Sequence, residues 1–292
     1  MRPIPSGVGA AERARSIWCR LPQTTVYYEM IGDGRPIVFL HGWSLDHTYE
    51  LSDFEPIFAR RAGWQRIYPD LPGCGRTPGS DRIVDQDGTL EVILAFIDTV
   101  LGDRAFLLAG TSAGAYLARG VAQRCASRMD GLLLRVPTVI VDAKNRTLPP
   151  FAPLVTDPDL TAAFVDEVGV GEPLVERSAY LKALRARMES VVLPPMAAAD
   201  KGFLDPIRED PARYGFSFDV DVGSAPFLAP TLIIVGRQDT SVGYRDAWQL
   251  VEQYSRATFV VLDRAGHIWP VDNRSLFEAL VEDWLARVSE YR

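Results

Sequence analysis

Gly110-Thr111-Ser112-Ala113-Gly114 directly follows an apolar run at residues 105–109, and this stretch decides the fold. A serine with a glycine two positions before it and another two positions after it, between a buried strand and a helix, is typical of a nucleophile elbow. Such a turn strains the serine backbone, admits only small neighbours and pushes the hydroxyl toward a substrate carbonyl. A tight turn whose serine caps the next helix is the alternative interpretation. The rest of the chain must decide between the two.

Short apolar strands alternate with amphipathic helices along most of the chain. Strands are predicted at residues 16–20, 24–31, 37–40, 66–68, 105–109, 131–136, 231–235 and 258–262. Helical spacing of apolar residues predicts helices near residues 51–58, 90–101, 115–125, 244–254 and 276–288. This alternation is typical of an α/β fold with a mostly parallel, buried sheet and right-handed crossovers. The first two strands are expected to form a hairpin instead.

The alternation breaks between residues 137 and 229. Prolines separate short helical patterns in this segment, and the patterns are Leu160/Phe164/Val168 and Leu181/Leu184/Met188. A stretch of roughly 90 residues without strand signal is too long for a loop. We therefore predict an α/β core at residues 1–136 and 230–292, with a helical cap inserted at residues 137–229. A second, independently folding domain is the weaker alternative, because the sheet pattern resumes after the segment.

The composition argues against several classes of function. The net charge is −7 and no run of Lys or Arg occurs, so a nucleic-acid or anionic-membrane surface is not expected. Apolar residues make up 47% and charged residues 24% of the chain, which is ordinary for a soluble globular protein. The three cysteines, Cys19, Cys74 and Cys125, lack metal-type spacing, so we expect no metal site and a reducing compartment.

The chain carries no sequence signal for a membrane or for secretion. No apolar stretch approaches the length of a membrane span. The first fifteen residues lack the apolar core of a secretory signal. We therefore expect a cytoplasmic protein, whose oligomeric state the sequence leaves open.

Three histidines are candidates for a general base. His47 precedes an amphipathic helix and is expected to be exposed, whereas His41 follows a strand and is expected to make a structural hydrogen bond. His267 alone lies in a glycine-preceded loop behind a late strand, 258–262. A lone loop histidine is commonly a surface residue. Its place after an elbow serine and a strand-end aspartate nevertheless favours His267 as the base.

Asp239 is the carboxylate that we expect beside His267. It follows the strand 231–235 in Gly236-Arg237-Gln238-Asp239. A carboxylate on the far imidazole nitrogen fixes the tautomer and stabilises the imidazolium that forms during catalysis. A turn aspartate bonded to its own backbone is the alternative role, and Asp142 is the alternative acid. We prefer Asp239 because the order Ser112, Asp239, His267 is the one expected on an open α/β sheet.

Two backbone N–H groups are predicted to form an oxyanion hole. The N–H of Ala113 lies at a helix N-terminus, where peptide dipoles favour an anion. The second donor is expected to be the N–H of Trp43, and Gly42 would let this backbone approach the substrate closely. Trp43 is alternatively a packing residue. We also place His41, Gly42, Trp43 and Trp269 at the wall of the substrate pocket.

The residues described so far resemble the α/β-hydrolase superfamily, in particular its capped, esterase-like members with a serine nucleophile. The likeness covers nearly the whole chain, and its five motifs are His41-Gly42-Trp43, Asp70-Leu71-Pro72-Gly73-Cys74-Gly75, the elbow, Gly236-Arg237-Gln238-Asp239 and Gly266-His267. The resemblance implies an eight-stranded, mostly parallel sheet flanked by helices, with a cap inserted after the sixth strand. It also implies Ser112 as nucleophile, Asp239 as acid and His267 as base. Cys74 departs from the residues common in that loop, and we expect it to be a buried, inert thiol.

A serine at the elbow argues against the haloalkane dehalogenases and epoxide hydrolases of this superfamily, which use aspartate there. We therefore predict hydrolysis of a carboxylic ester, lactone or thioester through an acyl-serine, with no metal or organic cofactor. The apolar cap predicts a small to medium, largely apolar substrate. A C–C or amide hydrolase or an acyltransferase with the same triad is the second interpretation. A ligand-binding or signalling protein with little turnover is the third.

Overall fold

A computed structural model describes residues 14–160, 162, 173–220, 227–271 and 273–291. Eight strands form one sheet in the order β1-β2-β4-β3-β5-β6-β7-β8. The strands are β1 (Arg15–Arg20), β2 (Thr25–Ile31), β3 (Arg35–Leu40), β4 (Trp64–Pro69), β5 (Phe106–Thr111), β6 (Met129–Arg135), β7 (Thr231–Gly236) and β8 (Ala257–Leu262). β2 runs antiparallel to β1 and to β4, and the other neighbours are parallel. The predicted α/β-hydrolase fold, including its hairpin, is thus confirmed.

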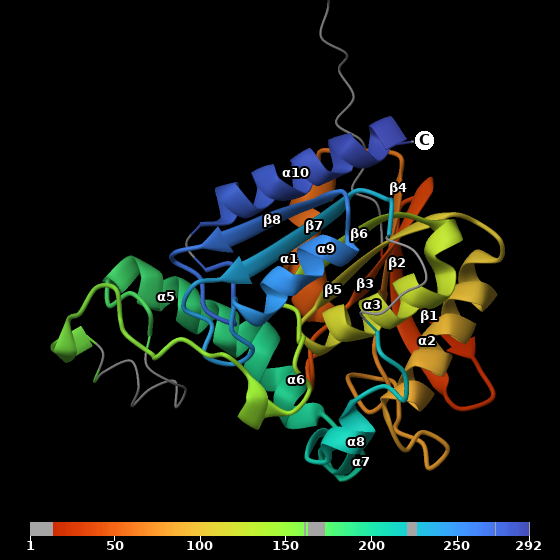
Figure 1. Cartoon of the computed structure of the whole chain (residues 1–292), viewed down its shortest axis with the longest axis horizontal. Coiled ribbons are helices and arrows are strands. Elements are labelled where there is room, and N and C mark those ends of the chain that lie inside the picture. Colours follow the sequence, from red (N-terminus) through yellow and green to blue (C-terminus); the bar gives the residue numbers. More distant parts are fainter. Residues whose placement is uncertain (1–13, 161, 163–172, 221–226, 272, 292) are drawn as a thin grey trace, which may run out of the picture.

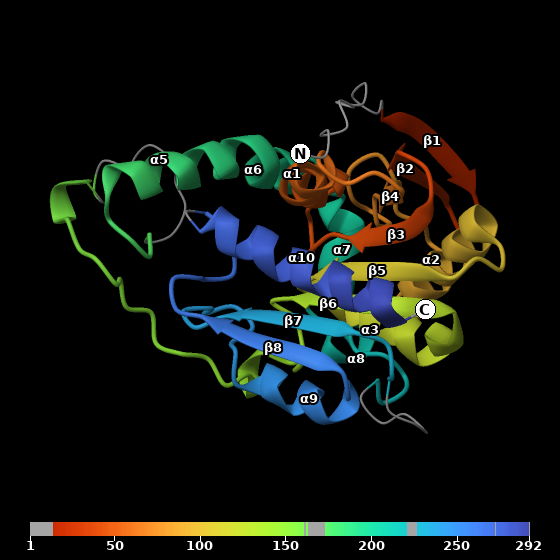
Figure 2. The ribbon, with the colours of Figure 1, turned by 90° about the horizontal axis from the view of Figure 1, so that it is seen from above.

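Helices cover both faces of the sheet (Figures 1 and 2). α1 (His47–Phe58) and α10 (Arg274–Tyr291) pack on one face, whereas α2 (Gln86–Leu101), α3 (Ala113–Cys125) and α9 (Leu250–Gln253) pack on the other. The alternation of side chains along a strand explains why both faces are apolar. In β3, Val38 and Leu40 join the cluster beneath α2 and α3, whereas Ile37 and Phe39 join the cluster beneath α1 and α10. The strands therefore read as continuous apolar runs.

The helices of the core begin where short acidic side chains can cap them. The carboxylate of Asp46 accepts the N–H of Thr48 at the start of α1, and that of Asp85 accepts the N–H of Gly88 at the start of α2. The helix predicted at 244–254 is wrong in extent. A 3₁₀ turn, η4 (Asp246–Gln249), precedes the short α9, so only its second half is α-helical.

The chain leaves the sheet after β6 and returns at β7, although these two strands are direct neighbours. In the described part of this excursion lie η2 (Ala143–Asn145), α5 (Ser178–Arg187), the π-helical turn η3 (Met188–Val192), α6 (Leu193–Ala198), α7 (Lys201–Arg208) and α8 (Pro211–Tyr214). Helices α5 to α8 lie beyond one end of the sheet, at the left and bottom of Figure 1. The Leu181/Leu184/Met188 pattern falls in α5 and the first residue of η3, and the Leu160/Phe164/Val168 pattern lies mostly outside the described residues. The division into core and cap remains a prediction.

Candidate active site

Ser112 occupies the sharp turn between β5 and α3, with φ 56° and ψ −114°. This backbone conformation is strained for a residue with a side chain. A Cβ atom on Gly110 would lie 2.4 Å from the carbonyl oxygen of Gly114, and one on Gly114 would lie 2.2 Å from that of Leu40. Neighbouring backbone atoms therefore lie too close to both positions for any side chain, and both positions require glycine. The alternative interpretation of the motif requires the Ser112 hydroxyl to cap α3. This hydroxyl makes no capping hydrogen bond to that helix.

The structure brings the three predicted side chains into one hydrogen-bonded chain. Ser112 Oγ lies 3.0 Å from His267 Nε2, and His267 Nδ1 lies 2.9 Å from Asp239 Oδ2. The other carboxylate oxygen of Asp239 accepts the N–H groups of Ser241 and Val242 at 2.8 and 3.0 Å. Because the Asp239 carboxylate accepts Nδ1–H, it leaves Nε2 free to accept the serine proton.

Asp239 is fully buried, and its surroundings hold it in the ionised form. Burial by itself raises the pKa of this carboxyl, but His267 and the two backbone N–H groups bring the pKa below its usual value. Asp142, the alternative acid, instead accepts the N–H of Lys144 at 3.0 Å in the turn η2. The structure thus places Asp239, not Asp142, beside the imidazole.

Strand register explains why residues so far apart in the sequence meet here. Leu40 pairs with Gly110, Thr111 pairs with Arg135, and Gly236 pairs with Leu262. The parallel strands β3, β5, β7 and β8 therefore end at one edge of the sheet, and the loops after them converge. This is the edge at which open α/β sheets bind ligands.

The two predicted oxyanion donors lie in segments next to Ser112. Ala113 is the first residue of α3, so its N–H has no acceptor within that helix. A Cβ atom on Gly42 would lie 3.5 Å from the Cβ of Ser112, which places the loop that carries Trp43 against the serine. The Trp43 indole packs edge-on against Tyr214 of α8, with 5.2 Å between ring centroids. Trp43 is therefore also a packing residue, as the alternative interpretation held.

Two predicted pocket residues are buried and hydrogen-bonded. His41 is fully buried: its Nδ1–H donates to the Gly42 carbonyl at 2.8 Å, and its Nε2 accepts the N–H of Leu71 at 2.9 Å. The structural hydrogen bond predicted for His41 is confirmed, and its place at the pocket wall stays a prediction. Trp269 packs edge-on against Phe277 and donates its indole N–H to Asn273 at 2.6 Å. Its place at the pocket wall also stays a prediction.

The predicted exposure of His47 is wrong. Its side chain is only 9% exposed, and Nδ1 lies 2.8 Å from Asp70 Oδ1. The other carboxylate oxygen of Asp70 accepts the N–H of Arg76, so this pair shapes the loop from Asp70 to Gly75. Cys74 in that loop is buried, and burial raises the pKa of its thiol to about 12, in keeping with an inert role.

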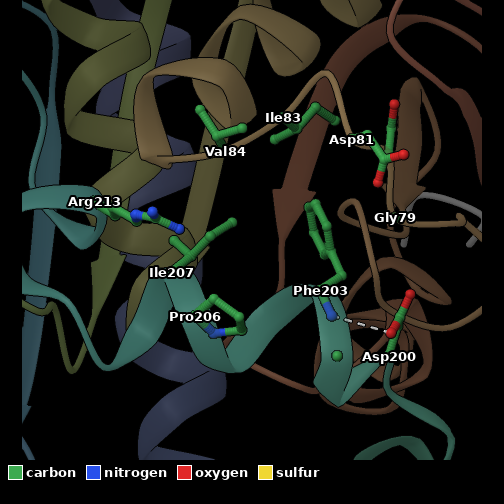
Figure 3. A pocket seen from close by; sticks show the side chains of 11 residues that line it. Gly79, Asp81, Ile83, Val84, Asp200, Phe203, Pro206, Ile207 and Arg213 are labelled. Carbon is green, nitrogen blue, oxygen red and sulfur yellow. Dashed lines mark hydrogen bonds between the residues drawn. The ribbon is translucent and has the colours of Figure 1, made fainter.

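Two cavities adjoin this edge of the sheet. An inner pocket of about 10 Å³ touches Trp43 and Ala113 and is otherwise walled mostly by apolar side chains. An outer cleft of about 590 Å³ lies between α7 and the loop 79–84, as Figure 3 shows. Phe203 and Ile207 of α7 line both cavities. The outer cleft is lined by none of the predicted triad or oxyanion residues, whereas the inner pocket is lined by both predicted oxyanion donors, one of which is the residue next to Ser112.

A buried ion cluster, formed by Arg135, Glu50, Asp53 and Arg187, lies behind the elbow. Arg135 donates to Glu50, Asp53 and the hydroxyl of Thr111, and Arg187 of α5 donates to both oxygens of Asp53 at 2.7 and 2.8 Å. Burial raises the pKa of Glu50, whereas the two arginines overcome the effect of burial on Asp53 and lower its pKa. This cluster joins α5 to the core, and no sequence pattern predicted it.

The described residues form neither a cluster of metal ligands nor a helix that could span a membrane. In the ranges given above, no group of three or more His, Cys, Asp or Glu side chains is placed to hold a metal ion. None of the helices described is both long enough and apolar enough to cross a bilayer.

Comparison with known proteins gives consistent matches. The model of a family described as "Alpha/beta hydrolase family" matches residues 37–280. The AB hydrolase superfamily protein YisY of Bacillus subtilis (strain 168) is 32% identical over 110 residues, which are 38% of this chain and 40% of that protein. A Pimeloyl-[acyl-carrier protein] methyl ester esterase of Pectobacterium carotovorum subsp. carotovorum (strain PC1) is 28% identical over 83% of this chain and 91% of that protein. The crystal structure of an alpha/beta superfamily hydrolase from Oenococcus oeni PSU-1 superposes with a TM-score of 0.78 at 27% identity, covering 90% of this chain and 96% of that one.

Proposed function

Because this chain belongs to the alpha/beta hydrolase family, we propose that it is a serine hydrolase with carboxylesterase-like activity, which cleaves a small-molecule ester through an acyl-serine. The observation that carries the proposal is the hydrogen-bonded chain from Ser112 Oγ through His267 to Asp239, with distances of 3.0 and 2.9 Å. Relatives that align over most of their length are named methyl ester esterases.

The geometry supports a two-step mechanism. The hydroxyl oxygen of Ser112 attacks the ester carbonyl carbon while His267 Nε2 takes its proton. The carbonyl oxygen becomes negative and accepts the N–H groups of Ala113 and Trp43. His267 then gives the proton to the leaving alcohol as the C–O bond breaks. A water molecule, deprotonated by His267 in the same way, releases the acid from Ser112.

The inner pocket suggests where the acyl group of the substrate binds. The inner pocket adjoins the oxyanion donors, so we place the acyl group there. Its volume of about 10 Å³ restricts this group to a short one. The apolar walls, which include Leu117, Leu204 and Ile207, suit the small, largely apolar substrate expected from the sequence. The cytoplasm remains the proposed compartment, which the free thiols of Cys19, Cys74 and Cys125 support.

Hydrolysis of p-nitrophenyl acetate and butyrate tests this proposal. The wild-type protein should release p-nitrophenol with a burst equal to the enzyme concentration, because with such an activated ester the acyl-serine forms faster than it hydrolyses and therefore accumulates. Ser112→Ala should lower kcat/KM by at least about 10³-fold. Ser289→Ala is the matched control, since that hydroxyl bonds the Leu285 carbonyl on α10, away from the triad. Equal activity of wild type and Ser112→Ala would refute the proposal, and inactivity of the wild type on every ester would favour the ligand-binding interpretation.

A further inference from the structure

Gln86 is a buried amide that the mechanism does not use. It is the first residue of α2 and has no exposed surface. Neither its Oε1 nor its Nε2 has a hydrogen-bond partner within the described part of the chain. Buried side-chain amides in folded proteins are nearly always paired, so an unpaired one needs an explanation.

The position of Gln86 supplies that explanation. Its side chain lines the inner pocket together with Trp43 and Ala113, the two predicted oxyanion donors. Thr89 lines the same pocket, but its hydroxyl already donates to the Asp85 carbonyl at 3.2 Å. Most of the remaining wall is apolar. Gln86 therefore brings an unused donor and an unused acceptor to the place where the acyl group of a substrate would lie.

We propose that Gln86 is a specificity-determining residue that recognises a neutral hydrogen-bonding group, a hydroxyl or an amide, on a short acyl chain. This inference rests on the proposed function and names its substrate class. A group that both donates and accepts can pair with Oε1 and Nε2 together. A carboxylate would meet one donor and one repelling oxygen, and no Lys, Arg or His is among the described residues that line the inner pocket. Anionic acyl chains should therefore be rejected.

The size of the pocket limits how far the acyl chain extends. A cavity of about 10 Å³ accommodates about one water-sized group, which is either a hydroxyl or the terminal oxygen or NH₂ group of an amide. A hydroxyl that takes this place restores hydrogen bonds to Gln86, whereas a methyl group of similar size leaves the amide unpaired. A site built in this way discriminates strongly between the two groups, because the rejected analogue leaves buried polar atoms unsatisfied.

Pairs of esters that differ only in this group test the inference. Ethyl 3-hydroxypropanoate is compared with ethyl butanoate, and ethyl malonamate with ethyl 3-methylbutanoate, each corrected for its rate of alkaline hydrolysis. The wild type should favour the polar member of at least one pair by about tenfold or more in kcat/KM, and the pair affected tells hydroxyl from amide. Monoethyl malonate should be a poor substrate.

Two variants separate hydrogen bonding from packing. Gln86→Met keeps the length of the side chain and removes both hydrogen-bonding atoms, so the preference should fall to about one. Thr89→Val removes a hydroxyl that is already bonded to the backbone in the same pocket, so the preference should remain at the wild-type value. If Gln86→Met fails to fold, the kcat/KM ratio of the wild type within each ester pair alone tests the inference.

The outcomes also separate this inference from the function on which it rests. If the wild type hydrolyses p-nitrophenyl acetate in a Ser112-dependent way but shows no preference within either pair, the inference is wrong and the esterase proposal stands. A preference that persists unchanged in folded Gln86→Met likewise overturns it. Absence of any Ser112-dependent ester hydrolysis would contradict the proposed function itself.

Discussion

The proposed triad of Ser112, His267 and Asp239 and the buried ion cluster are two polar assemblies that adjoin the turn between β5 and α3, and they are built differently. Ser112 donates its N–H to the carbonyl of Arg135 at 2.9 Å, so the two assemblies share this backbone link. In the ion cluster, the guanidinium groups of Arg135 and Arg187 pair with carboxylates that are shut off from water. In the triad, the His267 side chain is 28% exposed. A reactive group must be reachable, whereas a buried charge must be paired.

The largest expected effect follows from breaking the triad at its exposed member. His267→Gln should lower kcat/KM for p-nitrophenyl esters by at least about 10³-fold, because among the described residues only His267 has a side chain hydrogen-bonded to the Ser112 hydroxyl. The melting temperature should change little, since the imidazole is partly exposed. Steady-state kinetics with a thermal melt checks both statements. Near-normal turnover would show that another group is the base.

Breaking the ion cluster should lower the stability of the fold but leave the activity of the folded protein unchanged. Asp53→Ala leaves Arg135 and Arg187 buried without their shared carboxylate, and removing one partner of a buried pair costs about 3–5 kcal/mol. Urea unfolding measures this loss of stability. Any protein that remains folded should retain its burst of p-nitrophenol. An Asp53→Ala protein as stable as wild type would contradict the assignment of this cluster as structural.

Arg187 tests the same cluster with a smaller change. Arg187→Met removes the partner that comes from α5 but leaves Arg135 to neutralise Asp53, so the loss should be about 1–3 kcal/mol. Because this bond joins α5 to α1, limited proteolysis should cut faster between residues 178 and 198 than in wild type. Unchanged protection of that segment would show that other contacts hold it.

The smallest expected effect concerns His47, whose partner Asp70 shapes a loop of the inner pocket. Burial lowers the pKa of His47, but the Asp70 carboxylate and nearby acidic groups outweigh burial and raise the pKa above its usual value. Because the pKa of His47 is higher in the folded than in the unfolded protein, protonation of His47 stabilises the fold. This stabilisation is fully present below the unfolded-state pKa of about 6.5 and is lost as the pH rises through the folded-state pKa. The stability difference between wild type and His47→Gln should therefore be larger at pH 5.5 than at pH 9. A difference that grows toward pH 9 would contradict this sign.

The sheet and the triad could be predicted because their signals are local. Strands buried on both faces appear as apolar runs, and the elbow needs Gly110 and Gly114 within five consecutive residues. Ser112, Asp239 and His267 each follow such a strand, so parallel pairing alone brings them to one edge. The cap division and the catalytic roles themselves remain predictions.

The features that were missed depend on contacts between distant segments. Arg135 and Asp53 are 82 positions apart, and Asp53 and Arg187 are 134 apart. No local pattern links them. His47 and Gln86 stand near helix starts, where polar residues are ordinarily exposed, and only tertiary packing buries them.

The proposed function depends on the transfer of the acyl group to Ser112 during turnover. Intact-mass and peptide mass spectrometry of the wild type, quenched in acid during the burst with p-nitrophenyl butyrate, tests this directly. We expect one butyryl group per chain, located on Ser112, and no adduct in Ser112→Ala. Ester hydrolysis that proceeds with Ser112 unmodified, or with the acyl group on another residue, would contradict it.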